Sequence, residues 1–133
     1  MSDCIFCKIA QNKIPCYKVF ENDNFLAFLD NRPFVEGHTL VIPKLHYRWV
    51  YDVPQFKDLW DFAREVTKII KSSLNPEFIT YLTMGNEVPH AHIHLIPRYS
   101  GDQLTDLFLE EYRMNPSIDD FNLTISKIKK HDQ

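Results

Sequence analysis

The segment that most constrains the fold of this chain covers residues 88–98 and reads VPHAHIHLIPR. Histidines alternate in it with apolar residues, and successive side chains of a β-strand point to opposite faces. A strand over residues 90–96 would therefore align three imidazoles on one face, spaced about 6–7 Å apart. They belong to His90, His92 and His94. The apolar residues between them would pack into a core on the opposite face.

Three aligned histidines admit two chemical roles. They could hold a catalytic zinc ion, as three-histidine sites do, or one could be a covalent nucleophile while its neighbours handle the charge of an anionic substrate. On a regular strand, His90 and His94 would lie about 13 Å apart, too far for both to reach one ion through bonds of about 2 Å. The spacing favours separate roles for the three rings.

The remaining pattern predicts an α+β fold. We expect four further strands, at residues 17–20, 25–30, 38–42 and 78–84. Apolar residues at helical spacing predict a long helix that ends near Ser73, behind a start resembling a capping box at Asp52 and Gln55. An antiparallel sheet of about five strands with this long helix packed on it is the expected architecture.

The tail after the last strand carries two amphipathic patterns. One covers residues 104–112 and includes Leu107 and Phe108, and the other covers residues 118–128 behind a Ser117 cap. We therefore expect a helical C-terminal tail.

Length and charge limit the class of protein. The chain has 133 residues and a formal net charge of −3, which suits one domain and offers no basic surplus for nucleic-acid binding. Its apolar runs fall short of the about 20 residues of a membrane span, and its first residues do not read as a secretory signal. With three glycines there is no Gly-rich phosphate loop. We expect a cytoplasmic protein without nucleic-acid or membrane partners.

Two of the three cysteines, Cys4 and Cys7, form a C-x-x-C motif. In a reducing compartment such a pair is a metal half-site or a redox pair more often than a structural disulfide. Cys16 stands apart, and we interpret it as a small buried residue.

The triad segment resembles the His-φ-His-φ-His-φ-φ signature of the histidine triad (HIT) superfamily, where φ is an apolar residue. Upstream segments are similar in order and spacing: CIFCKI at 4–9, IP at 14–15, LAFLD at 26–30, GHTLVIPK at 37–44, and His46. The resemblance implies one HIT-like domain over residues 1–133, with a matched core at 1–98 and a helical extension at 99–133. The branch resembled is that of small nucleotide-binding hydrolases.

The resemblance implies a metal-free covalent mechanism. The middle histidine, His92, would attack the α-phosphorus of a nucleotide conjugate, and water would then release the nucleoside monophosphate from the nucleotidyl-histidine. His94 would hold an oxygen of the α-phosphate, and His38 would be the fourth histidine of the active site. The expected partner is a purine nucleotide or one of its conjugates.

The resemblance also assigns the nucleoside contacts. Asp30 would bind the ribose hydroxyls, with Asn31 as a second sugar contact, and Asn86 falls where relatives carry a glutamine. The apolar slot for the base would consist of Phe6, Ile9 and Phe28. Glu87 replaces a serine or threonine that commonly assists the leaving group, and an ionised carboxylate there would repel a polyphosphate.

A structural Zn²⁺ ion and a two-fold homodimer are further implications of the resemblance. The zinc ligands would be Cys4, Cys7, His46 and His90, a set that closes a tetrahedral site and takes no part in the chemistry. Trp60 and Phe62, on different faces of the long helix, would give that helix apolar surface for a dimer.

Three functions stay open at this point. The first is a hydrolase of adenosine phosphoramidates, aminoacyl adenylates or dinucleoside polyphosphates. The second is a nucleotidyltransferase or phosphorylase in which phosphate intercepts the same intermediate. The third is a zinc-stabilised nucleotide-binding module without catalytic activity.

Overall fold

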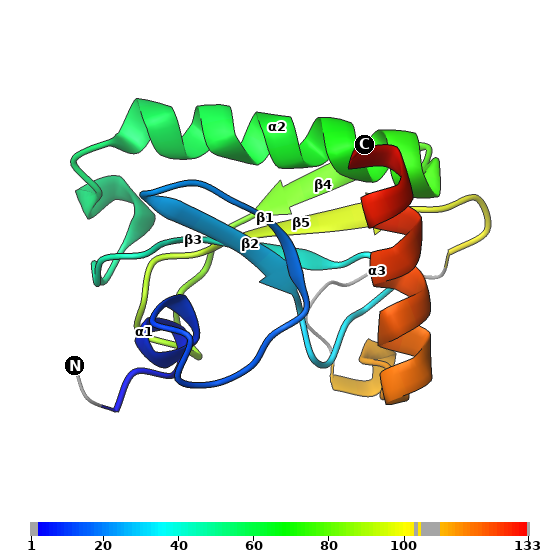
Figure 1. Cartoon of the computed structure of the whole chain (residues 1–133), viewed down its shortest axis with the longest axis horizontal. Helices are drawn as coiled ribbons and strands as arrows, with labels where there is room; N and C mark the ends of the chain where they lie inside the picture. The colour runs from blue at the N-terminus through cyan, green and yellow to red at the C-terminus, as the bar shows by residue number, and fades with distance from the viewer. Residues whose placement is uncertain (1–2, 103, 105–109, 133) are drawn as a thin grey trace.

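The computed structural model describes residues 3–102, 104 and 110–132. Five antiparallel strands form one sheet in the order β1-β2-β3-β5-β4, which confirms the expected α+β fold (Figure 1). The strands are β1 (Lys18–Glu21), β2 (Phe25–Leu29), β3 (Thr39–Pro43), β4 (Phe78–Leu82) and β5 (Ile93–Arg98). The helices are α1 (Ile5–Ala10), α2 (Phe56–Leu74) and α3 (Ile118–Asp132), with 3-10 turns η1 (Val50–Asp52) and η2 (Glu110–Tyr112).

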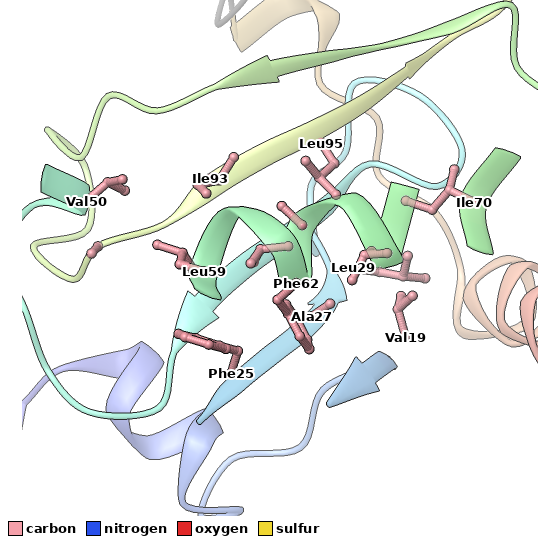
Figure 2. Close-up of a cluster of buried hydrophobic side chains, with 14 of the residues drawn as sticks. Val19, Phe25, Ala27, Leu29, Val50, Leu59, Phe62, Ile70, Ile93 and Leu95 are labelled. Atoms are coloured by element: carbon pink, nitrogen blue, oxygen red, sulfur yellow. The ribbon is translucent and has the colours of Figure 1, made fainter. Parts of the chain in front are cut away.

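The long helix α2 lies along one face of the sheet, and the main hydrophobic core fills the space between them (Figure 2). Residues that alternate along β2 and β5 enter this core: Phe25, Ala27, Leu29, Ile93 and Leu95. Because alternate residues face opposite ways, Leu26, Phe28 and His94 point to the other face. On that face Leu26 and Phe28 pack in a second buried cluster with α1. His94 therefore shares the α1 face of the sheet.

The C-terminal helix α3 crosses one end of the sheet and packs against α2 and β1. Its start confirms the predicted cap: the Asp120 N–H donates to Ser117 Oγ at 3.1 Å, and the Ser117 N–H donates to Asp120 Oδ2 at 3.0 Å. Phe121 stacks on Tyr17 with ring centroids 4.6 Å apart. The tail is thus part of the folded domain.

The predicted start of the histidine strand is wrong, because β5 begins at Ile93. Ile93 is paired with Val41 of β3, and continuing that ladder would bring it to Pro43, which has no N–H to donate. The chain turns instead: the N–H of His90 donates to Val88 O at 2.9 Å. The three histidines therefore do not form one continuous ladder.

The predicted capping box of α2 is also wrong. Pro54 disfavours helical geometry at the preceding residue, and Val53 is extended (φ −71°, ψ 120°). Asp52 ends η1, and α2 begins at Phe56 with Gln55 as an N-cap whose side chain makes no capping hydrogen bond.

Two other predictions need comment. The fourth strand ends at Leu82 rather than at residue 84. Of the tail pattern at 104–112, Leu107 and Phe108 lie outside the described residues. In the part of the chain that the structure describes, no helix is long and apolar enough to cross a membrane.

Candidate active site and metal site

Two adjacent clusters of polar side chains occupy the α1 face of the sheet. The first joins the start of α1 to the segments that follow β3 and precede β5. Its members are Cys4, Cys7, His46 and His90, whose ligand atoms all lie within 4.8 Å of one another. Cys4 caps α1 and accepts a hydrogen bond from the N–H of Cys7 at 3.4 Å. The short helix therefore holds both thiols at one point.

The imidazoles of this first cluster are oriented as metal ligands. His90 Nε2–H donates to the Pro43 carbonyl oxygen at 2.8 Å, so the unprotonated Nδ1 faces Cys4 Sγ at 3.3 Å and Cys7 Sγ at 3.5 Å. His46 Nδ1 lies 3.3 Å from Cys7 Sγ. Ligating histidines characteristically donate their second N–H to a carbonyl in this way.

Burial shapes the protonation of the same cluster. It lowers the pKa of His90 to about 4, which keeps that ring neutral. Burial and the neighbouring Cys4 raise the pKa of the Cys7 thiol to about 11. A bound divalent cation would stabilise the thiolates instead. Two thiolates and two neutral imidazoles are a donor set that fits tetrahedral zinc.

The second cluster is a chain of hydrogen bonds that fixes two imidazole tautomers. The backbone N–H of Phe34 donates to His38 Nδ1 at 3.2 Å, so the proton of His38 lies on Nε2. That proton is donated to His94 Nδ1 at 2.9 Å, which leaves His94 with its proton on Nε2. The two facing nitrogens already share this proton, which disfavours a metal ion between them.

The imidazole rings of His38 and His94 are both neutral near pH 7. Burial, the largest cause, together with charge repulsion, lowers the pKa of His94 to about 3 and that of His38 well below its ordinary value. His94 thus carries an uncharged N–H on Nε2.

His92 lies beside both clusters, and a hydrogen bond also fixes its tautomer. Its Nδ1 lies 2.7 Å from the backbone carbonyl oxygen of His90; a carbonyl only accepts, so Nδ1 carries the proton and Nε2 has a lone pair. Burial lowers the pKa of His92, partly offset by the His90 hydrogen bond and by Asp30 and Glu87. The ring meets Phe6 edge to face at 5.2 Å. His92 is therefore a neutral imidazole with a free electron pair.

A cleft of about 250 Å³ lies beside the rings of His92 and His94. Its lining includes Phe6, Asp30, Glu87, His92, His94 and Arg113. Asp30 lies at the end of β2, where Oδ1 accepts the Arg32 N–H at 2.9 Å and Oδ2 lies 3.7 Å from His38 Nε2. Burial raises the pKa of Asp30, although the Arg32 N–H and Arg113 oppose that shift. The cleft combines a neutral imidazole that has a free electron pair, a neutral N–H donor and a carboxylate.

Comparison with known proteins identifies the family. The HIT domain family model matches residues 11–101. The chain belongs to the HIT family. It is 42% identical over 106 residues to an uncharacterized HIT-like protein of Methanocaldococcus jannaschii, covering 74% of this chain and 81% of that one. The adenosine 5′-monophosphoramidase of Saccharomyces cerevisiae is 38% identical over 104 residues, covering 71% of this chain and 62% of that one.

The fold of this chain also matches that of a solved HIT-family structure. The Zn-bound histidine triad family protein of Mycobacterium smegmatis aligns with a TM-score of 0.80 at 28% identity. The alignment covers 98% of this chain and 96% of that one. The HIT-like fold expected from the sequence is confirmed.

The structure brings most of the residues expected from the HIT resemblance to the two clusters and the cleft. Asn31 also lines the cleft. Ile9 and Phe28 lie instead in the buried cluster behind Phe6, whose ring is 5.6 Å from that of Phe28. Asn86 is exposed and does not line the cleft. Of the three residues expected to form the slot for the base, Phe6 lines the cleft, and Ile9 and Phe28 do not.

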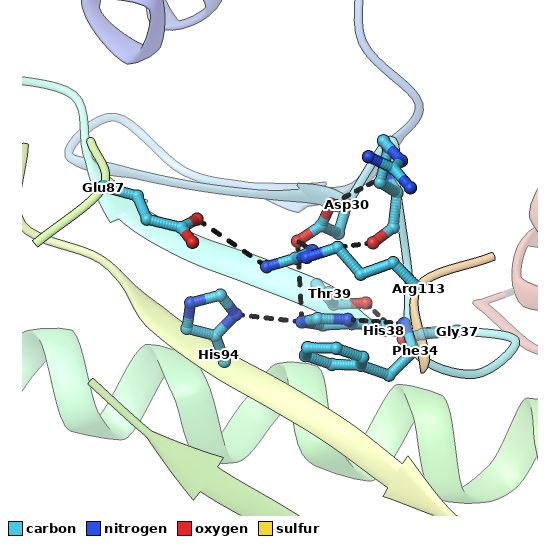
Figure 3. Close-up of polar contacts among 9 residues, drawn as sticks. Asp30, Phe34, Gly37, His38, Thr39, Glu87, His94 and Arg113 are labelled. Carbon is cyan, nitrogen blue, oxygen red and sulfur yellow. Dashed lines mark hydrogen bonds and ion pairs between the residues drawn. The ribbon is translucent and has the colours of Figure 1, made fainter. Parts of the chain in front are cut away.

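Arg113 is a charged cleft residue that sequence reasoning missed. It lies in the C-terminal tail, outside the matched HIT motifs, and its guanidinium reaches between Asp30 and Glu87 (Figure 3). One sequence signal pointed to such a residue: the carboxylate of Glu87 would repel the expected anionic substrate unless a cation lies nearby.

Proposed function

We propose that this HIT protein is a nucleotide hydrolase that cleaves the bond between an α-phosphate and its leaving group, in nucleoside 5′-phosphoramidates or dinucleoside polyphosphates. Family membership and similarity to a yeast adenosine 5′-monophosphoramidase support nucleotide hydrolysis. The observation that carries the mechanism is the hydrogen bond between His92 Nδ1–H and the His90 carbonyl. It keeps the electron pair of Nε2 available for attack.

The reaction proceeds in two steps. The Nε2 electron pair of His92 forms a bond to the α-phosphorus while the P–N or P–O bond breaks, and the leaving group departs with that bonding pair. A departing amine also takes up a proton from solvent, and the attacking water gives one up in the second step. Water then attacks the phosphorus, releases the nucleoside monophosphate and restores neutral His92. Throughout, the Nε2–H of His94 donates to an α-phosphate oxygen, and His38 holds that tautomer.

The nucleoside occupies the cleft beside these rings. The carboxylate of Asp30 accepts hydrogen bonds from the two ribose hydroxyls, and Asn31 is a second polar contact. The base, a purine, packs against Phe6. Burial of Asp30 in the free protein makes its pairing with hydroxyls favourable, because a buried carboxylate needs donors.

We further propose that the cluster of two cysteines and two histidines holds a structural Zn²⁺ ion. The convergence of its four ligand atoms within 4.8 Å supports this assignment, as does the Zn-bound relative. When bound, the metal would fix the start of α1 to the segment after β3 and to His90. Such a reduced site fits a cytoplasmic protein.

A homodimer across the edge strand β4 completes the proposal. Phe78 and Tyr81 of β4 and Phe56 of α2 are exposed apolar residues, and Trp60 stacks on Tyr81. The expected role of Phe62 was wrong, because that ring is buried in the core beside Phe20 and Phe25.

A product assay tests the proposed function. Wild-type protein and His92→Ala are each mixed with adenosine 5′-phosphoramidate, and the products are separated by chromatography. Release of AMP by the wild type alone supports hydrolysis through His92, whereas equal release by both proteins contradicts it. Added phosphate that yields ADP instead would assign a phosphorylase. Nucleotide binding without turnover would assign a binding module.

A further inference from the structure

Arg113 is held over the catalytic cleft by the tail that precedes α3. The backbone N–H of the following residue, Met114, donates to the Pro33 carbonyl at 2.7 Å. Further along, Thr124 and Lys127 of α3 both donate to Glu36 Oε2, at 2.8 and 2.9 Å. The tail is thus tied at several points to the loop between β2 and β3. Arg113 belongs to a fixed part of the molecule.

The contacts of the guanidinium fix one of its edges. Nη1 donates to the Arg32 carbonyl oxygen at 2.7 Å and lies 3.6 Å from Asp30 Oδ2. The carbon of the group lies 4.6 Å from the centroid of the Phe34 ring, in cation–π contact. The Arg113 side chain is 7% exposed. A guanidinium held this way is preorganised before any ligand arrives.

The other edge faces a partner that can be displaced. Nη2 lies 3.7 Å from Glu87 Oε2, and the Glu87 side chain is 62% exposed. A charge-assisted hydrogen bond is about 2.7–2.9 Å long, so this ion pair is loose. Glu87 can turn toward solvent at little cost, so an anionic ligand in the cleft can replace its carboxylate beside Nη2.

The charges around the cleft indicate what the Nη2 edge of Arg113 can bind. His38 and His94 are neutral near pH 7 for the reasons given above, so they donate to phosphate without balancing a second negative charge. Glu87 adds a negative charge on the same side. An arginine stays protonated at every relevant pH. Arg113 therefore supplies a permanent positive charge where the cleft needs one.

We propose that Arg113 determines leaving-group specificity: its Nη2 binds an anionic group, such as sulfate or phosphate, attached to the α-phosphate, in place of Glu87. This inference rests on the proposed function. In the first step the bond from His92 Nε2 to phosphorus forms as the P–O bond to the leaving group breaks. The leaving anion keeps the bonding electron pair, and Arg113 balances the added negative charge.

Two substrates that differ in the leaving group alone test this role. Adenosine 5′-phosphosulfate releases sulfate, whereas adenosine 5′-phosphoramidate releases an uncharged amine, and both present the same nucleoside and α-phosphate. We expect Arg113→Ala to lower kcat/KM by about tenfold or more for the phosphosulfate and by less than about threefold for the phosphoramidate. Arg113→Lys should restore part of the loss, because it keeps the charge but not the planar geometry.

Two further variants sharpen the result. Arg64→Ala removes an exposed arginine of α2, and we expect it to leave both rates unchanged. Glu87→Gln removes the competing carboxylate, so it should raise kcat/KM for the phosphosulfate relative to the phosphoramidate. A fall in that ratio would contradict the proposed exchange of partners.

The outcomes separate this inference from the function on which it rests. An equal loss of kcat/KM on both substrates in Arg113→Ala would assign the residue to the α-phosphate or to the fold. Cleavage of the phosphoramidate but not of the phosphosulfate by the wild type would also overturn the inference, while the hydrolase stands. If the wild type cleaves neither substrate, the proposed function itself fails.

Discussion

Substitution of His38 by leucine is a demanding test of the hydrogen-bond chain in the active site. The His38 side chain is fully buried. It accepts a hydrogen bond from the Phe34 N–H and donates one to His94, which fixes the tautomer of both imidazoles. Leucine fills a similar volume but neither accepts nor donates. The variant therefore leaves the Phe34 N–H without its acceptor and His94 Nδ1 without its donor.

The structure sets the size of both expected effects. An unpaired buried polar group costs about 1–3 kcal/mol, and His94 recovers part of its loss by moving its proton to Nδ1. We expect His38→Leu to lower the free energy of unfolding by about 2–4 kcal/mol and the melting temperature by roughly 8–16 °C. The moved proton also deprives the α-phosphate of a donor, which lowers kcat about 10²-fold.

Urea unfolding and AMP release from adenosine 5′-phosphoramidate measure the two effects. His38→Gln is the matched control, because its amide carries one acceptor and two donors, and we expect it to recover part of the stability and rate. A leucine variant as stable and as active as the wild type would refute the reasoning. So would a glutamine variant that is worse than leucine on both measures.

Three other predictions follow from the same structure. Because the pKa of His94 is lowered from 6.5 to about 3, the unfolded chain takes up a proton first on acidification, so stability is full above about pH 6.5 and falls toward pH 3; urea unfolding against pH should show a smaller slope in His94→Asn. Cys7→Ser should remove bound zinc, measured by elemental analysis of the purified protein, whereas Cys16→Ser, outside the cluster, should retain it. Phe78→Glu on the exposed edge strand should convert a dimer to a monomer in sedimentation velocity, whereas Ile118→Glu, which is also exposed, should not.

Much of the fold could be predicted because its signals are local. Periodicity of 3.6 residues predicts α2 and α3, and β-branched residues before Pro43 predict β3. The short helix α1 was not predicted. Its formation depends on the Cys4 cap and on burial against β2 and β3, and neither can be read from six residues in isolation.

The limits of prediction at the site have a common physical cause. Where β5 begins is decided by a partner strand that ends in a proline, and the turn of His90 toward the cysteines follows from that. Arg113 reaches Asp30 across 83 positions of sequence, and this approach depends on how the tail packs. The grouping of the histidines and cysteines was predictable because these residues match the motifs of the HIT family in order and spacing. The cation over the cleft is fixed by tertiary structure alone.

The most direct test of the central claim is detection of the covalent intermediate on His92. Protein mixed with adenosine 5′-phosphoramidate is quenched in alkali, which preserves a phosphorus–nitrogen bond to histidine, then digested and analysed by peptide mass spectrometry. We expect one adenylyl group on the peptide that contains His92, located on that residue by fragmentation, and none in His92→Ala. An adenylyl group on His94, or AMP release by the wild type with no adenylylated peptide at any quench time, would contradict the account.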